Sequence, residues 1–181
     1  MCGITVGMKF TASQVESISG VGQGTLDYWA RTGVAKPAEN AGRGRGNGKH
    51  YTFTELVGLR AIERLRSQSV SLQAVRRLLP ELRRLTDKEG SNLDVLARTR
   101  LVILPGRDVA VLTSDAELVS LLTAPGQGVM APVLLSMGDT VRDVQARMTE
   151  AAVSDKQMAN AVTELKRGGA WFKDETENRA A

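Results

Sequence analysis

A basic, glycine-rich segment in the first third of the chain constrains the fold more than any other feature. Residues 39–50 read ENAGRGRGNGKH and hold four glycines, two arginines, one lysine and the only histidine. Such a segment has no large apolar side chain to bury, so it is predicted to run through solvent as a loop. The core of this half therefore has to come from the residues before and after the loop.

Helix-start patterns flank the loop on both sides. Thr11 and Gln14 have the spacing of a capping box, in which each side chain bonds the other residue's backbone N–H, so a helix is predicted to begin there. A glycine break follows, and a second helix is predicted at about residues 25–32. Beyond the loop, Thr52 and Glu55 repeat the capping box and begin a third helix.

Apolar residues at helical spacing extend this first half to a fourth helix. The third helix carries apolar residues every three or four positions from Leu56 to Leu65, and Ser71 caps the helix that follows. Pro80 lies near the middle of this fourth helix and is expected to kink or split it.

The pattern changes after residue 90 to a mixture of strands and helices. Residues 100–104 and 109–112 are apolar runs joined by Pro-Gly-Arg-Asp, which predicts a β-hairpin. The other elements expected here are a short helix capped by Ser114 with Glu117, a third strand at residues 129–135, a helix capped by Asp139 that reaches about Ala152, and a last helix near residues 155–166.

Positive charge is concentrated in the first half. Residues 1–86 contain 13 Lys and Arg against 6 Asp and Glu, whereas residues 87–152 contain 6 against 9, in a chain of net charge +4. A basic module beside a slightly acidic one indicates a part that binds a polyanion, joined to a part with another task.

Cysteine and histidine usage excludes several kinds of site. The one cysteine, Cys2, rules out an internal disulfide and a multi-thiolate metal site. His50, the one histidine, lies in the loop and leaves no His-based general base and no His-rich metal site. Several carboxylates of the second half fall at turn or cap positions, where Asp serves structure. We therefore expect no enzyme, no catalytic residue, no cofactor and no metal.

The sequence also lacks the patterns of a membrane-spanning segment and of a secretion signal. No apolar run approaches the roughly 18–20 residues that span a bilayer. The first residues, MCGITVGMKF, lack the basic and apolar regions of a secretion signal. We therefore expect a soluble cytoplasmic protein, and no membrane partner.

The order of the elements in the first half suits double-stranded DNA. It places one helix and one flexible cationic loop on the same side of a small core. B-DNA offers a major groove that admits a helix and, beside it, phosphates and a minor groove that cations can reach. Arg43, Arg45 and Lys49 have glycine neighbours, which lets each cation approach DNA closely. The alternative interpretation of this loop is a flexible linker that binds nothing.

Residues 24–37, GTLDYWARTGVAKP, resemble the second-helix signature of the MerR-type regulators. Residues 49–56, KHYTFTEL, are similar to the segment that leads into the next helix of that family, and residues 59–79 resemble the helix pair that follows. The resemblance covers residues 8–86 in the correct order. It implies a winged helix-turn-helix whose second helix enters the major groove of double-stranded DNA.

The resemblance also implies a set of DNA-contacting residues. The second helix would face the bases, and the loop would hold phosphates or the minor groove. The residues expected to contact DNA are Thr11, Gln23, Thr25, Tyr28, Arg31, Arg43, Arg45, Lys49, His50 and Tyr51.

Two features depart from the family pattern. Asp27 stands where the family usually has an arginine, and an acid would repel phosphate although it can accept a hydrogen bond from a cytosine amino group. The long dimerisation helix of the family is absent or short, because no sustained heptad pattern follows Leu85. Any pairing of subunits is therefore expected from residues 91–167.

These patterns predict an α+β chain with a mostly α winged helix-turn-helix followed by a small α/β domain that contains a β-hairpin and helices. The apolar faces of the first four helices lead us to expect that residues 1–86 fold without the rest. The expected segments are a flexible leader at 1–7, a DNA-binding domain at 8–86, an α/β dimerisation or partner-binding domain at 91–152, and a C-terminal helix with a disordered tail at 153–181.

The second half resembles a small domain attached to MerR-like heads in some VapB-type antitoxins, and an unrelated α/β dimerisation domain is the alternative. The leading hypothesis is a nucleoid-associated, sequence-specific regulator of transcription that represses as a homodimer. A second hypothesis is an antitoxin that represses its own operon and binds a protein toxin through its C-terminal half. A third is an excisionase-like architectural protein that bends DNA.

Overall fold

The computed structural model describes residues 9–35, 37, 39–40, 49–88, 98–104, 109–114, 116–117 and 133–167. The predictions made for the leader at residues 1–7, for Arg43 and Arg45, and for the tail at residues 168–181 lie outside this part of the chain.

Two short helices follow the first described residues. They are α1 (Ala12–Ser19) and α2 (Gln23–Thr32), and the second begins two residues earlier than predicted. The capping box of α1 is confirmed, since the Thr11 hydroxyl accepts from the Gln14 N–H at 3.4 Å and the Gln14 side chain accepts from the Thr11 N–H at 3.0 Å. Gly20 ends α1 with a φ of 76°, a left-handed conformation that glycine adopts without steric cost and that turns the chain into α2.

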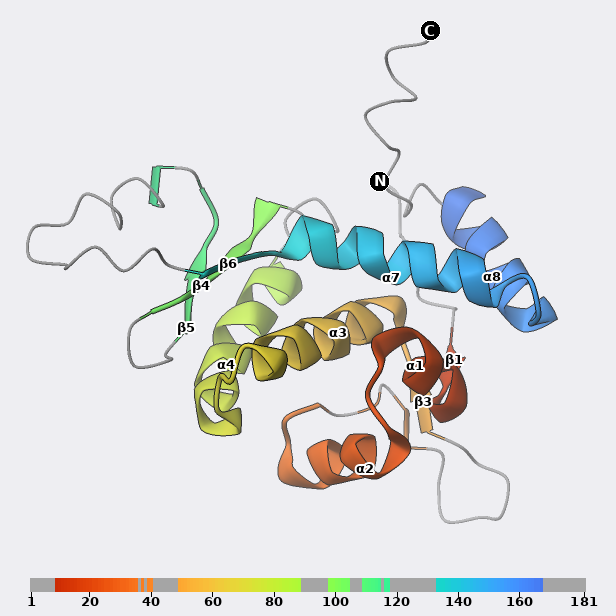
Figure 1. The fold of residues 1–181 in the computed structure, drawn as a ribbon, viewed down its shortest axis with the longest axis horizontal. Helices are drawn as coiled ribbons and strands as arrows, with labels where there is room; N and C mark the ends of the chain where they lie inside the picture. The colour runs from red at the N-terminus through yellow and green to blue at the C-terminus, as the bar shows by residue number, and fades with distance from the viewer. Residues whose placement is uncertain are drawn as a thin grey trace, which may run out of the picture.

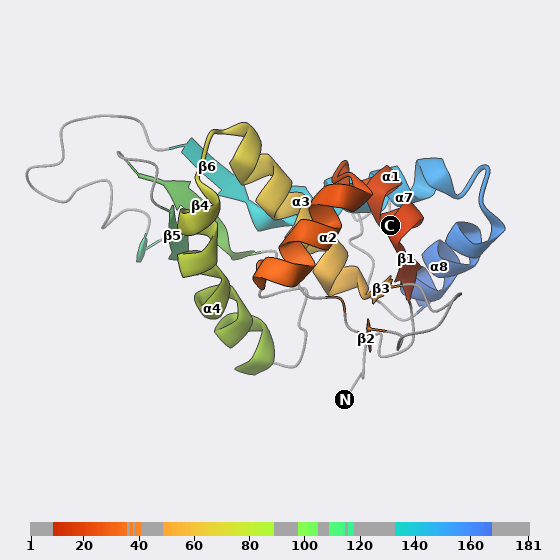
Figure 2. The same ribbon diagram turned by 90° about the horizontal axis from the view of Figure 1, so that it is seen from below.

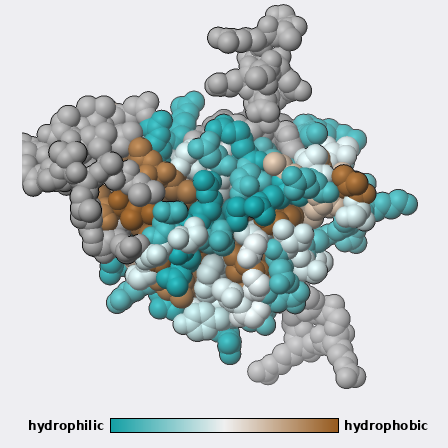
Figure 3. Space-filling model, in the orientation of Figure 1, coloured by the Kyte–Doolittle hydropathy of each residue, from teal (hydrophilic) through white to brown (hydrophobic). Residues whose placement is uncertain are grey.

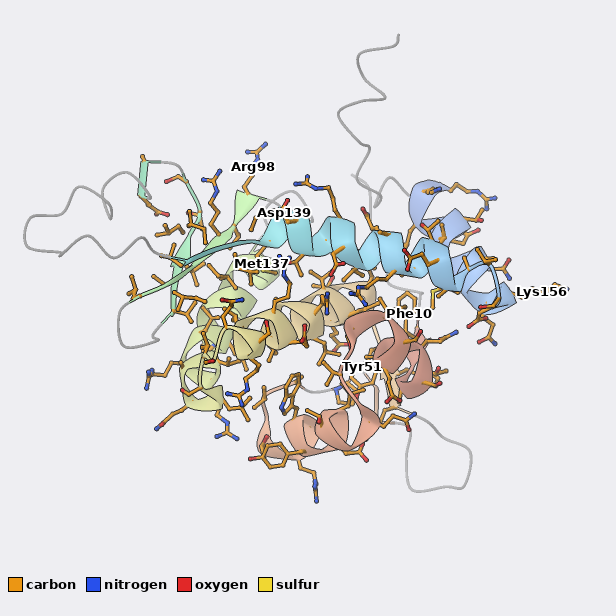
Figure 4. All side chains as sticks on the ribbon, in the orientation of Figure 1. Phe10, Tyr51, Arg98, Met137, Asp139 and Lys156 are labelled. Carbon is orange, nitrogen blue, oxygen red and sulfur yellow. The ribbon has the colours of Figure 1, made fainter. Side chains whose placement is uncertain are left out.

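A small antiparallel sheet includes both ends of the segment that was predicted as a loop over residues 39–50. That prediction was wrong at residues 39–40 and 49–50, which pair as strands. Strands β1 (Phe10–Thr11) and β2 (Glu39–Asn40) pair on either side of β3 (Lys49–Tyr51). Phe10 lies opposite Tyr51, and each is only 1% exposed. Figure 4 shows both aromatic side chains beside α1. The sheet is therefore attached to the helical core through its two aromatic residues.

The helix pair predicted after the loop consists of α3 (Phe53–Ser67) and α4 (Leu72–Lys88). The capping box of α3 is confirmed: the Thr52 N–H donates to the Glu55 carboxylate at 2.7 Å, and the Glu55 N–H donates to the Thr52 hydroxyl at 3.2 Å. Helix α4 continues through Pro80, so the predicted split does not occur.

A second sheet lies in the second half. Strands β4 (Arg100–Ile103) and β5 (Val109–Leu112) form the predicted hairpin, and β6 (Val133–Ser136) pairs antiparallel with the other edge of β4. The sheet order is β5-β4-β6, and β5 contacts α4. The expected helix start at Ser114 is present as a reciprocal pair of hydrogen bonds between Ser114 and Glu117, each 3.3 Å long.

Two helices complete the described chain, α7 (Met137–Ala151) and α8 (Lys156–Arg167). The predicted cap of α7 was wrong, because Ser136 and not Asp139 occupies the N-cap position. The Ser136 hydroxyl accepts from the Asp139 N–H at 3.2 Å, which places Asp139 inside the first turn. Figure 4 shows Met137 and Asp139 at this end of the helix.

One hydrophobic cluster runs through both halves of the chain. Helix α7 packs against α1 and α3, on the side of α3 opposite to α2 (Figure 1). Buried residues of α7, such as Val144 and Met148, belong to the same cluster as Leu26, Trp29 and the aromatic residues of β1 and β3. The fold class is confirmed as an N-terminal helix-turn-helix followed by an α/β region, and the two parts share a core.

The shared core predicts that a cavity in α7 weakens the distant α2. We expect Met148→Ala to lower the free energy of unfolding by about 2–5 kcal/mol, because Met148 is fully buried. The same shift is expected at Trp29, which belongs to the same cluster. Urea unfolding followed by tryptophan fluorescence in a Trp171→Phe background measures this, since Trp29 is then the only tryptophan.

Glu150→Ala is the control, because Glu150 is an exposed residue of the same helix and its loss leaves no cavity. If the Trp29 transition stays in place in the Met148→Ala chain, the two halves unfold independently, as expected if residues 1–86 fold alone.

Candidate nucleic-acid interface

Helix α2 divides its side chains into a buried face and an exposed polar face. Leu26 and Trp29 are 2% and 4% exposed and anchor the helix to the core. Figure 2 looks toward the free side of α2, where the helix crosses in front of α3. A helix that is held by one face and free on the other can enter a major groove. The exposed face carries four of the predicted DNA-contacting residues: Gln23, Thr25, Tyr28 and Arg31.

The first residue of α2 is fixed by a contact with α1. The Gln23 side-chain amide donates through Nε2 to the Glu16 carboxylate at 2.9 Å. This hydrogen bond directs the amide nitrogen of Gln23 toward α1. The carbonyl oxygen of the same amide has no partner among the residues that the structure describes.

An ion pair joins α2 to the wing, by which we mean β2, β3 and the residues between them. The Lys49 ammonium on β3 donates to Oδ1 of Asp27 on α2. The Lys49 side chain is 33% exposed and that of Asp27 is 60% exposed, so the pair lies at the surface. The structure thus brings the predicted contacts of α2 and one predicted contact of the wing to a single surface.

His50 and Tyr51, two other predicted contacts, point less toward solvent. Tyr51 is 1% exposed, and its hydroxyl and Nδ1 of His50 are enclosed without a hydrogen-bond partner in the described part of the chain. Burial raises the pKa of Tyr51, and the negative charges of Asp27 and Glu55 raise it further, so the phenol stays protonated. Tyr51 therefore anchors β3 in the core in this structure.

Thr11 lies beside the wing but uses its hydroxyl for the cap of α1. It is half-buried and lies opposite His50 in the pairing of β1 with β3. Arg43 and Arg45 fall between β2 and β3, outside the described residues. Their predicted contacts with DNA remain predictions.

Arg60 on α3 bonds to the end of α1, next to the turn that leads into α2. Its Nη1 donates to the Ser19 carbonyl oxygen at 3.2 Å and to the Glu63 carboxylate at 2.8 Å, and its Nε donates to Asp143 on α7 at 2.6 Å. Only 14% of the Arg60 side chain is exposed. One guanidinium group therefore joins α3, α7 and the end of α1.

The partner of Arg60 on α7 has a shifted pKa. Partial burial raises the pKa of Asp143, but hydrogen bonds and charges from Arg60 and Arg147 outweigh it and hold the pKa below the ordinary value. A second contact lies one turn along α3, where Arg64 donates to the Thr140 hydroxyl at 3.1 Å. Helix α7 is thus fixed to α3 by polar contacts as well as by the core.

A further polar contact ties α8 to α1. Nε2 of Gln14 donates to Asp155 at 2.9 Å, and the same carboxylate accepts from the backbone N–H groups of Gln157 and Met158 at 2.8 and 3.3 Å. The hydrogen bond from Gln14, followed by that from Met158, lowers the pKa of Asp155. Gln14 therefore serves the capping box of α1 and also the start of α8.

Sequence reasoning did not identify the residues that hold the helices of the interface in place. Glu16, Arg60 and Asp143 were not among the predicted site residues. The main partner of Arg60 lies 83 positions later in the chain, a separation that no local pattern encodes. Asp27 did stand out as a departure from the family pattern, but its pairing with Lys49 was not predicted.

Within the described ranges, no three His, Cys, Asp or Glu side chains come together in a way that could hold a metal ion. None of the helices in the described part is long and apolar enough to cross a membrane.

Residues 10–82 match the family of MerR HTH family regulatory proteins. The chain is also similar to an uncharacterized HTH-type transcriptional regulator of Mycobacterium tuberculosis and to one of Mycobacterium bovis, with 31% identity over 112 residues in each case. The aligned part is 62% of this chain and 46% of each relative, so the chain spans less than half their length. Because the family match ends at residue 82, the resemblance of the second half to VapB-type antitoxins stays a prediction.

The lowered pKa of Asp143 predicts an acid-sensitive contribution to stability. The contribution is fully present above the ordinary pKa of Asp, about 3.9, and is lost as the pH falls through the lower folded-state value. We expect Asp143→Asn to lower the free energy of unfolding at about pH 7 by about 1.5–3 kcal/mol. We also expect the variant to lose less stability than the wild type on acidification. Urea unfolding between about pH 7 and about pH 3 measures both effects.

Asp139→Asn is the matched control, because Asp139 lies on the same helix, is 55% exposed and pairs with Arg142. An exposed pair of this kind contributes about 0–1 kcal/mol. Equal losses in the two variants would mean that the contact between Arg60 and Asp143 adds no more than a surface pair.

Proposed function

Since residues 10–82 form a MerR-type helix-turn-helix domain, we propose that this chain is a sequence-specific regulator of transcription that binds double-stranded DNA as a dimeric repressor. Helix α2 enters the major groove, and the wing contacts phosphates or the minor groove beside it. The names of the mycobacterial relatives, HTH-type transcriptional regulators, support this function.

The observation that carries the proposal is the joint surface of α2 and β3. Helix α2 lies on the side of α3 away from α7 (Figure 1), and its exposed residues include Asp27, which pairs with Lys49. Helices α7 and α8 therefore support the domain from behind without covering this face. Tyr28, which is 44% exposed, offers the groove both an apolar ring and a hydroxyl group.

Phosphate contacts position such a protein, and base contacts give its sequence preference. The predicted wing cations Arg43 and Arg45 are assigned to phosphates or to the minor groove, and α2 to the bases. A regulator of this kind acts on chromosomal DNA, so we place it in the cytoplasm at the nucleoid. We propose no catalytic activity.

Pairing of two subunits is assigned to the second half. A symmetric dimer reads two half-sites that are a whole number of helical turns apart. Leu134 on β6 is an apolar side chain that is 45% exposed. Figure 3 shows hydrophobic surface at this end of the molecule. These features support a pairing surface that includes β6.

The DNA-binding proposal predicts a strong salt dependence. We expect the affinity of the full chain for its selected sequence to fall about 10³-fold or more between about 50 and 200 mM salt, because several cations displace counterions from phosphates.

Arg31→Ala is expected to weaken binding about tenfold, because it removes a charged contact from the exposed face of α2. Gel-shift titrations at several salt concentrations measure both.

Arg167→Ala is the control for charge, since Arg167 is 72% exposed on α8, away from the proposed surface. A flat salt response would contradict DNA binding altogether. If the Arg31→Ala and Arg167→Ala chains bind the selected sequence with equal affinity, Arg31 does not contact the DNA.

The pairing proposal predicts that Leu134→Lys gives a monomer, because a charge on the apolar surface of β6 opposes its burial. Sedimentation velocity of the full chain measures the oligomeric state. Val153→Lys is the control, because Val153 is 90% exposed in the turn between α7 and α8. A Leu134→Lys chain that remains dimeric would place the pairing surface elsewhere.

A further inference from the structure

Asp27 is the only acidic residue of α2, and it lies among the residues proposed to face DNA. It follows Gln23 by four positions, so the two side chains share one face of the helix. DNA phosphates repel a carboxylate, and an acid in this place therefore needs a compensating cation and a favourable partner on the DNA.

Gln23 and Asp27 both present oxygen acceptors on this face. The amide nitrogen of Gln23 is engaged by Glu16, which leaves its carbonyl oxygen to accept. Oδ1 of Asp27 accepts from Lys49, and Oδ2 has no partner among the residues that the structure describes. This part of α2 therefore suits hydrogen-bond donors on the DNA.

Lys49 supplies the compensating cation. Because it reaches Asp27 from the wing, it neutralises the carboxylate and leaves Oδ2 open. The pair has no net charge, so Asp27 can approach the groove without the repulsion that an unpaired carboxylate would meet.

We propose that Asp27 is a specificity-determining residue whose carboxylate accepts a hydrogen bond from the N4 amino group of a cytosine in the major groove, with Lys49 as its counterion. Cytosine presents a donor at its major-groove edge and no acceptor there, whereas guanine and thymine present acceptors that repel a carboxylate. Adenine has an amino group too, but its N7 acceptor lies beside it. The inference rests on the proposed function, because it requires α2 to lie in the major groove.

The experiment is selection of bound sequences from random double-stranded DNA by the full chain, followed by affinity measurements on each single-base variant of the selected site. We expect the wild type to prefer cytosine at one position of each half-site by about tenfold or more over the other bases. Asp27→Ala is expected to lose that preference while the other positions stay unchanged. Its affinity for unselected DNA is expected to be equal or higher, because a negative charge has been removed.

Asp27→Asn makes the test sharper. Asparagine offers a donor beside its acceptor and pairs with N6 and N7 of adenine. We therefore expect this variant to change the preferred base at the same position from cytosine to adenine. Asp27 is exposed, and circular dichroism melting curves check that the variants keep their fold.

Glu164→Ala is the matched control, since Glu164 is 56% exposed on α8 and pairs with Arg167. It removes the same charge at a distance from α2, and we expect an unchanged selected sequence. Lys49→Ala tests the counterion: its effect on affinity should be larger in the wild-type chain than in the Asp27→Ala chain, where no carboxylate is left uncompensated.

The outcomes separate this inference from the function on which it rests. A wild-type chain that selects no sequence overturns the proposed function and this inference with it. A wild-type preference that Asp27→Ala retains at every position overturns only the role of Asp27. Equal losses for Lys49→Ala in the two backgrounds overturn the role of Lys49 as its counterion.

Discussion

The geometry of the helix-turn-helix depends on the nearly enclosed guanidinium group of Arg60. It donates to groups on three elements: the Ser19 carbonyl at the end of α1, Glu63 on its own helix, and Asp143 on α7. A charge in this position is tolerated only where its donors meet acceptors, so these groups favour one arrangement of the helices. Gly20 fits the same arrangement, because its φ of 76° is a left-handed conformation that glycine adopts without steric cost. The turn that orients α2 is therefore held in place by Arg60 of α3 and its partners.

In this arrangement, one side of the helix-turn-helix packs against the second half of the chain and the other side is exposed. Helix α7 packs on α1 and α3, and α8 packs on α7, while the polar face of α2 and its ion pair with Lys49 stay exposed. On the open side, Gln23 and Asp27 each have a hydrogen-bond partner within the protein before any DNA arrives. Side chains that are already fixed lose less conformational freedom on binding, which favours a specific contact over an adaptable one.

The sequence predicted what depends on neighbouring residues. Both capping boxes and the hairpin were confirmed, because each is decided within a few positions of the chain. The cap of α7 was wrong because Ser136 precedes Asp139 and bonds its N–H first. The packing of α7 on α1 and α3 could not be predicted, since Arg60 meets its partner across 83 positions. The same limit hid the partner of Asp27, which reaches α2 from the far side of the glycine-rich loop.

The single hydrophobic cluster also bears on what incomplete copies of this chain can do in a cell. A product that stops after α4 would keep every residue of α2 and of the wing but would lack the helix that covers α1 and α3. Its exposed apolar surface makes it a substrate for proteases and chaperones. Prematurely ended or cleaved copies would therefore be removed before they could compete with intact protein for the same DNA. The core that the two halves share would in this way separate intact copies of the chain from incomplete ones.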